Sequence, residues 1–132
     1  MSTATRKPEQ ISTRVETVSA RATRAASTTQ TPVAAEFREP DLVSIVMPAL
    51  NEEAAIGETI ANVPIEEFKK LGLRVEIVVV DNGSTDRTAE IATAAGARVV
   101  PEPRRGYGNA YRCGFKEASG AFICTMDADS TY

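Results

Sequence analysis

An alternation of two kinds of hydrophobic pattern over residues 42–126 constrains the fold of this chain more than any other feature. Four short apolar runs, LVSIVM, VEIVVV, ARVV and AFICTM, occupy residues 42–47, 75–80, 97–100 and 121–126. Between them lie three longer segments with helix-type spacing, at residues 51–63, 84–96 and 106–120. Strand and helix therefore alternate, which predicts an α/β domain with a Rossmann-like parallel sheet. The nearly continuous apolar strands indicate that helices cover both faces of the sheet.

Local signals predict the ends of these helices. Asn51, the first residue of the first helical segment, has a side chain favoured as an N-cap. Ser84 or Thr85 can cap the second segment, and Gly96 is a favourable stop after it.

Small residues recur every four positions in the third helical segment, at Ala110, Gly114 and Ala118. Residues with this spacing share one face of a helix. The pattern predicts that this helix lies very close to the sheet.

The first forty residues have a different composition. Residues 1–40 contain twelve Ser or Thr residues and few large apolar ones, with six basic and four acidic side chains. Such a segment cannot bury enough surface to offset its ordering entropy, so we expect a disordered polar tail over 1–40 and a folded part over 41–132. The folded part carries nine basic and fourteen acidic residues, which argues against nucleic acid as a partner.

Two cysteines, Cys113 and Cys124, match no metal-binding or redox spacing. We interpret them as buried free thiols in a reducing compartment, which predicts a cytoplasmic protein. No apolar run approaches the length of a membrane-spanning helix.

Mainly acidic segments, PALNEE, DNGSTD and DAD, follow three of the four predicted strands, whereas PEPRRGYGN, with one glutamate and two arginines, follows the third. Ligands of open parallel sheets bind outside the carboxyl ends of the strands, so these segments form the candidate site. Asp86 by itself is interpreted as a turn or helix-cap residue. Asp127 and Asp129 form a D-x-D pair after a buried strand, and two such carboxylates can share Mg²⁺ or Mn²⁺ through oxygen ligands.

Four ordered blocks carry a resemblance to a known family. VSIVMPALNEE, IVVVDNGSTDRT, RRGYGNAYRCGF and ASGAFICTMDADSTY are similar to the nucleotide-sugar half of family 2 glycosyltransferases of the GT-A fold. Among these, the chain most resembles polyprenyl-phosphate (dolichol-phosphate) mannosyl- and glucosyltransferases. The resemblance covers nearly all of residues 42–132 and none of the tail.

The resemblance implies nine nucleotide-sugar-binding residues: Pro48, Leu50, Glu52, Val80, Asp81, Asn82, Asp127, Ala128 and Asp129. It assigns the metal to Asp127 and Asp129, with Asp129 the better candidate for direct ligation. The family usually has two acids where this chain has Asp81 and Asn82, which leaves uracil and guanine open as the base. Arg104, Arg105 and Gly108 fall where the family lines the nucleotide pocket; for the two arginines, a solvated turn is the alternative.

The same resemblance implies the whole reaction: transfer of a hexose from UDP or GDP to a polyprenyl phosphate, with inversion, at the cytoplasmic face of a membrane. A GT-A domain continues well beyond its D-x-D motif, so we expect this chain to be an N-terminal fragment with no catalytic residue of its own and no activity alone.

Two alternatives remain. A non-catalytic nucleotide-binding module would share the same cleft. A dinucleotide-binding oxidoreductase domain would require G-x-G-x-x-G after the first strand, where the chain has PALNEE.

Overall fold

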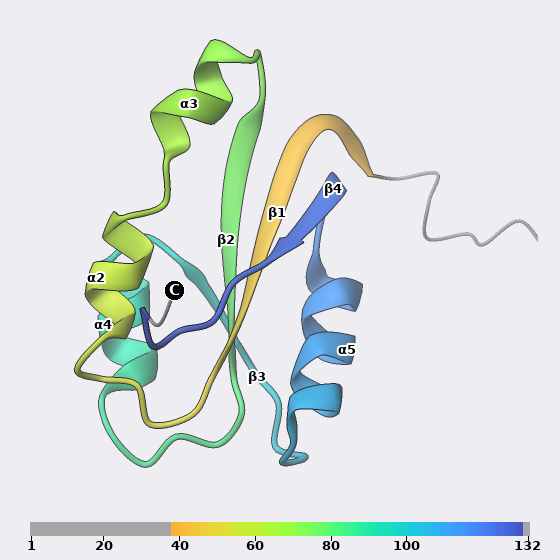
Figure 1. Cartoon of the computed structure of the whole chain (residues 1–132). Helices are drawn as coiled ribbons and strands as arrows, with labels where there is room; N and C mark the ends of the chain where they lie inside the picture. The colour runs from red at the N-terminus through yellow and green to blue at the C-terminus, as the bar shows by residue number, and fades with distance from the viewer. Residues whose placement is uncertain (1–37, 131–132) are drawn as a thin grey trace, which may run out of the picture. The chain divides into compact units, whose positions relative to one another are not determined.

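The computed structural model describes residues 38–130 (Figure 1). The predicted disordered tail lies outside the described residues except for residues 38–40. The first strand begins at Glu39, inside the segment that we assigned to the tail.

The elements of the described part follow in the predicted alternation, with one additional helix. In chain order they are β1 (Glu39–Ala49), α2 (Ile56–Ala61), α3 (Ile65–Lys70), β2 (Arg74–Asp81), α4 (Thr88–Ala94), β3 (Arg98–Pro101), α5 (Tyr107–Glu117) and β4 (Gly120–Thr125).

The four described strands form one parallel sheet in the order β3-β2-β1-β4, which confirms the predicted fold class. β1 is central and pairs with both β2 and β4. Ala49 pairs with Asp81, and Asp81 pairs with Pro101. The carboxyl ends of three strands therefore meet at one edge.

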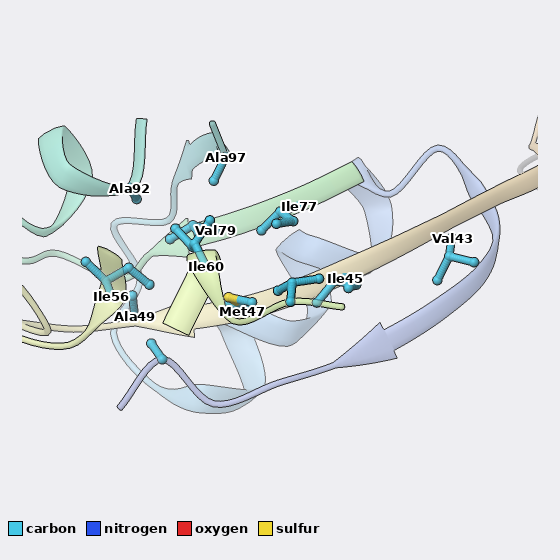
Figure 2. Packing of buried hydrophobic residues seen from close by; sticks show 12 residues of the cluster. Val43, Ile45, Met47, Ala49, Ile56, Ile60, Ile77, Val79, Ala92 and Ala97 are labelled. Carbon is cyan, nitrogen blue, oxygen red and sulfur yellow. The ribbon is translucent and has the colours of Figure 1, made fainter. Parts of the chain in front are cut away.

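Alternate residues of β1 face two separate cores. Val43, Ile45 and Met47 pack with α2, α4 and one face of β2 (Figure 2). Val46 faces the opposite side, where it packs with Val78 and the α5 layer. Helices α2 and α4 thus cover one face of the sheet and α5 covers the other (Figure 1), as the continuous apolar strands predicted.

The small-residue face of α5 lies directly against the sheet. Ala110, Gly114 and Ala118 are all buried, which confirms the predicted close approach. A Cβ atom on Gly114 would lie 2.3 Å from Cγ1 of Val46 and 3.1 Å from Cγ2 of Val80. Glycine is therefore required here by space and not by backbone conformation.

This contact predicts the effect of adding one methyl group. Gly114→Ala should lower the free energy of unfolding by about 1–3 kcal/mol, because the helix must move away from β1. Gly108→Ala is the matched variant, because nothing lies within 4 Å of a Cβ atom added at Gly108. Alanine is the better helix former, so this substitution should raise the free energy of unfolding by up to about 1 kcal/mol. Urea unfolding followed by circular dichroism measures both. Equal effects of the two substitutions would contradict the packing described for α5.

The first helical segment differs from the prediction. The structure divides residues 51–63 into a loop and the short helix α2, and Asn51 is not its N-cap, because α2 begins only at Ile56. Asn51 instead adopts a left-handed conformation with φ of 56° and bonds the loop after β2. Helix α3 was not predicted.

The other helix ends are partly as expected. Neither Ser84 nor Thr85 caps α4, which begins at Thr88. Gly96, with φ of 94°, follows its last turn and confirms the predicted stop. Helix α5 ends at Glu117, since Gly120 already belongs to β4. No helix formed by residues 38–130 has the length and apolar character needed to cross a bilayer.

Candidate functional site

A cleft of about 280 Å³ opens beside the carboxyl ends of β1 and β2. The residues that line it are Pro48, Ala49, Leu50, Glu52, Asn82, Gly106, Tyr107, Ala110, Ala128 and Asp129. They come from the ends of β1 and β2, the start of α5 and the turn after β4. Six of the nine residues proposed from the sequence lie among them.

Three of the proposed residues do not line the cleft. Val80 is fully buried in the core beneath α5. The carboxylate of Asp81 accepts a hydrogen bond from the amide of Ser84, 2.9 Å away, and so shapes the loop after β2. Asp127 is exposed just after β4, one residue before the cleft lining begins at Ala128.

Two loops at this edge hold each other through reciprocal hydrogen bonds. The amide of Asn51 donates to Oγ of Ser84 (3.0 Å), and Oδ1 of Asn51 accepts from the amide of Thr85 (2.8 Å). The amide of Glu52 donates to the buried hydroxyl of Thr88 (2.8 Å). The loop after β1 is therefore fixed on the loop after β2, which sets the position of Glu52 in the cleft.

Asp86 extends this contact. Its carboxylate accepts hydrogen bonds from the amide and hydroxyl of Thr88 and from the amide of Glu53. These donors, the Thr88 hydroxyl first, hold the pKa of Asp86 below its usual value. Asp86 precedes Arg87, the N-cap residue of α4, and its carboxylate bonds the first amide of that helix, so it is a turn residue, one of the two interpretations given from the sequence.

Asn82 anchors the segment that follows β3. It is 5% exposed, and its Nδ2 donates to the carbonyls of Glu102 (2.9 Å) and Arg104 (2.8 Å). Its Oδ1 accepts from the amide of Gly106 at 2.8 Å. Both donor hydrogens are thus used, and one acceptor position remains. Sequence reasoning did not identify this role, because the partners lie twenty or more positions away along the chain.

An ion pair stiffens the same segment. Arg104 bonds both carboxylate oxygens of the nearly buried Glu102, at 2.9 and 2.7 Å, and its amide bonds one of them as well. The Arg104 side chain and amide lower the pKa of Glu102 to about 2. Arg104, Arg105 and Gly108 do not line the cleft, and the Arg105 guanidinium donates to the carbonyl of Gly83 at 3.4 Å.

Four of the lining residues, Ala49, Gly106, Tyr107 and Ala110, were not proposed individually, although the first three lie in the segments that the sequence indicated as the candidate site. Tyr107 is 67% exposed and supplies an aromatic ring to the cleft, tilted against the ring of Tyr111 at 6.1 Å. The available signal was position, because the first turn of the helix after β3 lies at the carboxyl edge of the sheet.

The two carboxylates after β4 fit a partial metal site. Asp127 and Asp129 are both exposed, and the described residues contain no cluster of three or more His, Cys, Asp or Glu side chains suited to a metal ion. Carboxylate oxygens are the ligands that Mg²⁺ and Mn²⁺ prefer, and Mg²⁺ commonly keeps waters and substrate phosphates as further ligands. The pair therefore fits an ion that a bound diphosphate helps to hold.

The cysteines form no disulfide in the described part of the chain. Cys113 is half-buried, and burial raises the pKa of its thiol. Cys124 is exposed, so the prediction that both thiols are buried is wrong for this residue. It lies on β4, at the edge of the sheet.

Comparison with known proteins identifies relatives of this arrangement. The family model described as glycosyl transferase family 2 matches residues 44–132. An uncharacterized glycosyltransferase of Mycobacterium tuberculosis is 42% identical over 91 residues, 69% of this chain and 38% of that protein. An undecaprenyl-phosphate 4-deoxy-4-formamido-L-arabinose transferase of Pseudomonas aeruginosa is 41% identical over 96 residues, 67% of this chain and 28% of that protein.

A solved structure shows the same likeness in three dimensions. Glucosyl-3-phosphoglycerate synthase of Mycobacterium tuberculosis, in complex with Mn²⁺, UDP-glucose and phosphoglyceric acid, superimposes with a TM-score of 0.55 and 33% identity. The match covers 72% of this chain and 34% of that one. The chain spans well under half the length of the relatives that it matches.

Proposed function

Since the chain belongs to glycosyl transferase family 2, we propose that its cleft binds the nucleoside diphosphate of a UDP- or GDP-sugar. The observation that carries this proposal is the convergence of Pro48, Leu50, Glu52, Asn82, Ala128 and Asp129 on one cleft from segments far apart in sequence. Such a cleft lies where open α/β sheets bind ligands, outside the carboxyl ends of the strands.

The lining residues suggest how the nucleoside is held. Leu50 is 41% exposed and Tyr107 is 67% exposed, so both present apolar surface on which a base can pack. Glu52 supplies a carboxylate that can accept from a ribose hydroxyl or a base N–H. Asn82 borders the cleft with one unused acceptor position. Asp81 does not line the cleft, and its role would be indirect, through the loop after β2 that its carboxylate holds.

The diphosphate would lie toward Asp129, with Asp127 beside it. A bound Mg²⁺ or Mn²⁺ supplies charge stabilisation for the leaving diphosphate. Asp129 borders the cleft and Asp127 does not, which supports Asp129 as the direct ligand. The mycobacterial synthase, whose structure holds Mn²⁺ and UDP-glucose, supports the proposal that the cleft takes a divalent cation together with a nucleotide sugar.

We extend the proposal to the reaction of the whole protein. An oxygen of a polyprenyl phosphate would bond to the anomeric carbon of the hexose, while the bond from that carbon to the diphosphate oxygen breaks with inversion. The acceptor phosphate has a second pKa of about 6 and is largely ionised at neutral pH, so it needs little help from a general base. The Pseudomonas relative, named for an undecaprenyl phosphate, supports a lipid acceptor at a membrane surface.

The dinucleotide-binding alternative loses its support at the same cleft. The end of β1 and the loop after it bring Pro48, Leu50 and Glu52 to the cleft, where a pyrophosphate bound in that manner needs glycine amides. A non-catalytic nucleotide-binding module uses the same residues as the main proposal, and the experiment below separates it.

Calorimetric titration of the chain with UDP, GDP and ADP, each with and without Mn²⁺, tests the proposal. We expect UDP or GDP to bind at least about tenfold more tightly with Mn²⁺, because Asp127 and Asp129 would hold the ion and its charge would offset that of the diphosphate. ADP should bind weakly, since adenine lacks the ring N–H of uracil and guanine. Equal affinity for all three, or no response to Mn²⁺, would reject the proposal. If the full-length protein binds the nucleotide sugar but transfers no sugar, the non-catalytic module is favoured.

A further inference from the structure

A single hydroxyl on α2 contacts the turn that carries Asp129. Thr59 is only 2% exposed, and its Oγ1 lies 3.1 Å from the carbonyl oxygen of Ala128 and 2.5 Å from Oγ of Ser130. It also lies 3.1 Å from the carbonyl of Ala55, one turn back in its own helix. The last contact is the usual way for a helical threonine to satisfy its hydroxyl. The two contacts with the turn are additional, and they join parts of the chain about seventy residues apart.

The chemistry of a hydroxyl makes this contact directional. It carries one proton and two acceptor positions, so the carbonyls of Ala55 and Ala128, both 3.1 Å away, share the one proton while the oxygen accepts from the Ser130 hydroxyl. Both flanking residues of Asp129 are thereby held by the same oxygen. Ala128 is also fixed by packing, because it is 4% exposed and belongs to the core cluster that contains Ile56 and Ile60 of α2.

The turn needs such support. Ser130 adopts φ of 58°, a backbone conformation that residues other than glycine seldom occupy. Asp127 and Asp129 are two residues apart and both exposed, so like charge favours their separation. A backbone fixed on both sides of Asp129 presents its carboxylate to the cleft before any ligand arrives, which reduces the ordering cost of binding.

We infer that Thr59 is a positioning residue for the diphosphate and metal end of the cleft, holding Asp129 in its binding position through Ala128 and Ser130. This inference rests on the proposed function of the cleft. It assigns a role in binding to α2, the helix that otherwise packs on the sheet and contributes no residue to the cleft lining.

The experiment compares Thr59→Val, which keeps the shape of the side chain but removes its hydroxyl, with Thr59→Ser, which keeps the hydroxyl. Mn²⁺ affinity at saturating UDP, measured by electron paramagnetic resonance, should fall about tenfold in Thr59→Val and remain within about twofold of the parent in Thr59→Ser. UDP affinity without metal should not change. Amide hydrogen exchange should become faster at residues 128–130 in Thr59→Val and stay unchanged in β4.

Thr93 provides the matched control. Its hydroxyl donates to the carbonyl of Ala89 at 2.8 Å, the same contact within a helix that Thr59 makes with Ala55, and it is exposed on α4. Thr93→Val should leave Mn²⁺ affinity unchanged. Should Thr59→Val fold poorly, Ser130→Ala removes the other partner at an exposed position and should still weaken Mn²⁺ binding severalfold.

The outcomes are distinct. If the parent chain binds UDP with Mn²⁺ and both Thr59→Val and Ser130→Ala retain full Mn²⁺ affinity, the positioning role is wrong while the proposed function stands. If the parent chain does not bind Mn²⁺ with UDP at all, the proposed function of the cleft fails and this inference fails with it. A loss in Thr59→Val that serine does not restore would show that packing, and not the hydroxyl, matters at this position.

Discussion

Replacing Asp129 with asparagine is expected to weaken Mn²⁺ binding to the UDP-saturated chain on the order of 100-fold. Asparagine has nearly the shape of aspartate, but it lacks the charge that a hard divalent cation requires. Asp129 is exposed and follows the last described strand, so the substitution should leave the melting temperature unchanged. In an intact enzyme, the same change should lower hexose transfer by orders of magnitude.

Asp41 offers a control carboxylate far from this edge. It lies near the amino end of β1 and pairs with Arg74, whose guanidinium holds the pKa of Asp41 below its usual value. Asp41→Asn should leave Mn²⁺ affinity unchanged. A metal affinity that falls equally in both variants would point to long-range charge, and full affinity in Asp129→Asn would remove this residue from the metal site.

Asn82→Leu is the second substitution with a large expected effect. It removes three hydrogen bonds and leaves the carbonyls of Glu102 and Arg104 and the amide of Gly106 without their partner. An unmade buried hydrogen bond is costly, so we expect a loss of about 3 kcal/mol in the free energy of unfolding. The segment that ends at Gly106 would also lose its position in the cleft, which should lower UDP affinity.

Asn109 tests whether any asparagine bonded to this region behaves in the same way. Its Nδ2 donates to the carbonyl of Arg105 at 3.1 Å, but this contact is exposed. Asn109→Ala should change stability by no more than about 0.5 kcal/mol. Thermal and urea unfolding of the two variants measure the difference. A similar loss for both would show that burial of the Asn82 amide is not what makes its hydrogen bonds important.

The sequence predicted the strands well because apolar runs follow the sheet. The expectation that the strand before Asp127 is buried is wrong, because β4 is an edge strand and four of its six residues are exposed, Phe122 at 56%. Every predicted strand is present, and the face of α5 that carries Gly114 packs as expected. The helix starts were less predictable, because the side chains that resemble caps are used elsewhere. The side-chain oxygen of Asn51 accepts a hydrogen bond from the loop after β2, so Asn51 does not cap α2. Local preference was overruled there by a contact between two loops.

Helix α3 shows the opposite situation: its sequence carries clear helix signals, but the helix was not predicted from them. Pro64 precedes it, its first turn carries Glu66 and Glu67, and its last turn carries Lys69 and Lys70. Pro64 serves as the N-cap, and each glutamate pairs with the lysine three residues later. Charge of this polarity complements the helix dipole, so the segment could have been predicted from its composition.

The residues of the candidate site likewise fall into those that could be predicted from the sequence and those that could not. Residues that meet the cleft at strand ends, such as Pro48 and Asp129, could be proposed from topology and family resemblance. Thr59 and Asn82 could not be given their supporting roles from the sequence, because their hydrogen bonds depend on tertiary contacts. A polar residue in a helix or at a strand end has many uses, and only its neighbours in the fold select among them.

The strand order also determines when the site can assemble during synthesis. Val43 of β1 pairs with Val75 of β2 on one side and with Phe122 of β4 on the other. The two edges of β1 are therefore completed at very different stages of translation. Chain segments form near contacts before distant ones, because closing a longer loop costs more entropy. The nucleoside side of the cleft can therefore exist on the ribosome while the carboxylates for the diphosphate are still inside the exit tunnel. Until β4 emerges, the open edge of β1 is the surface that a chaperone would need to shield.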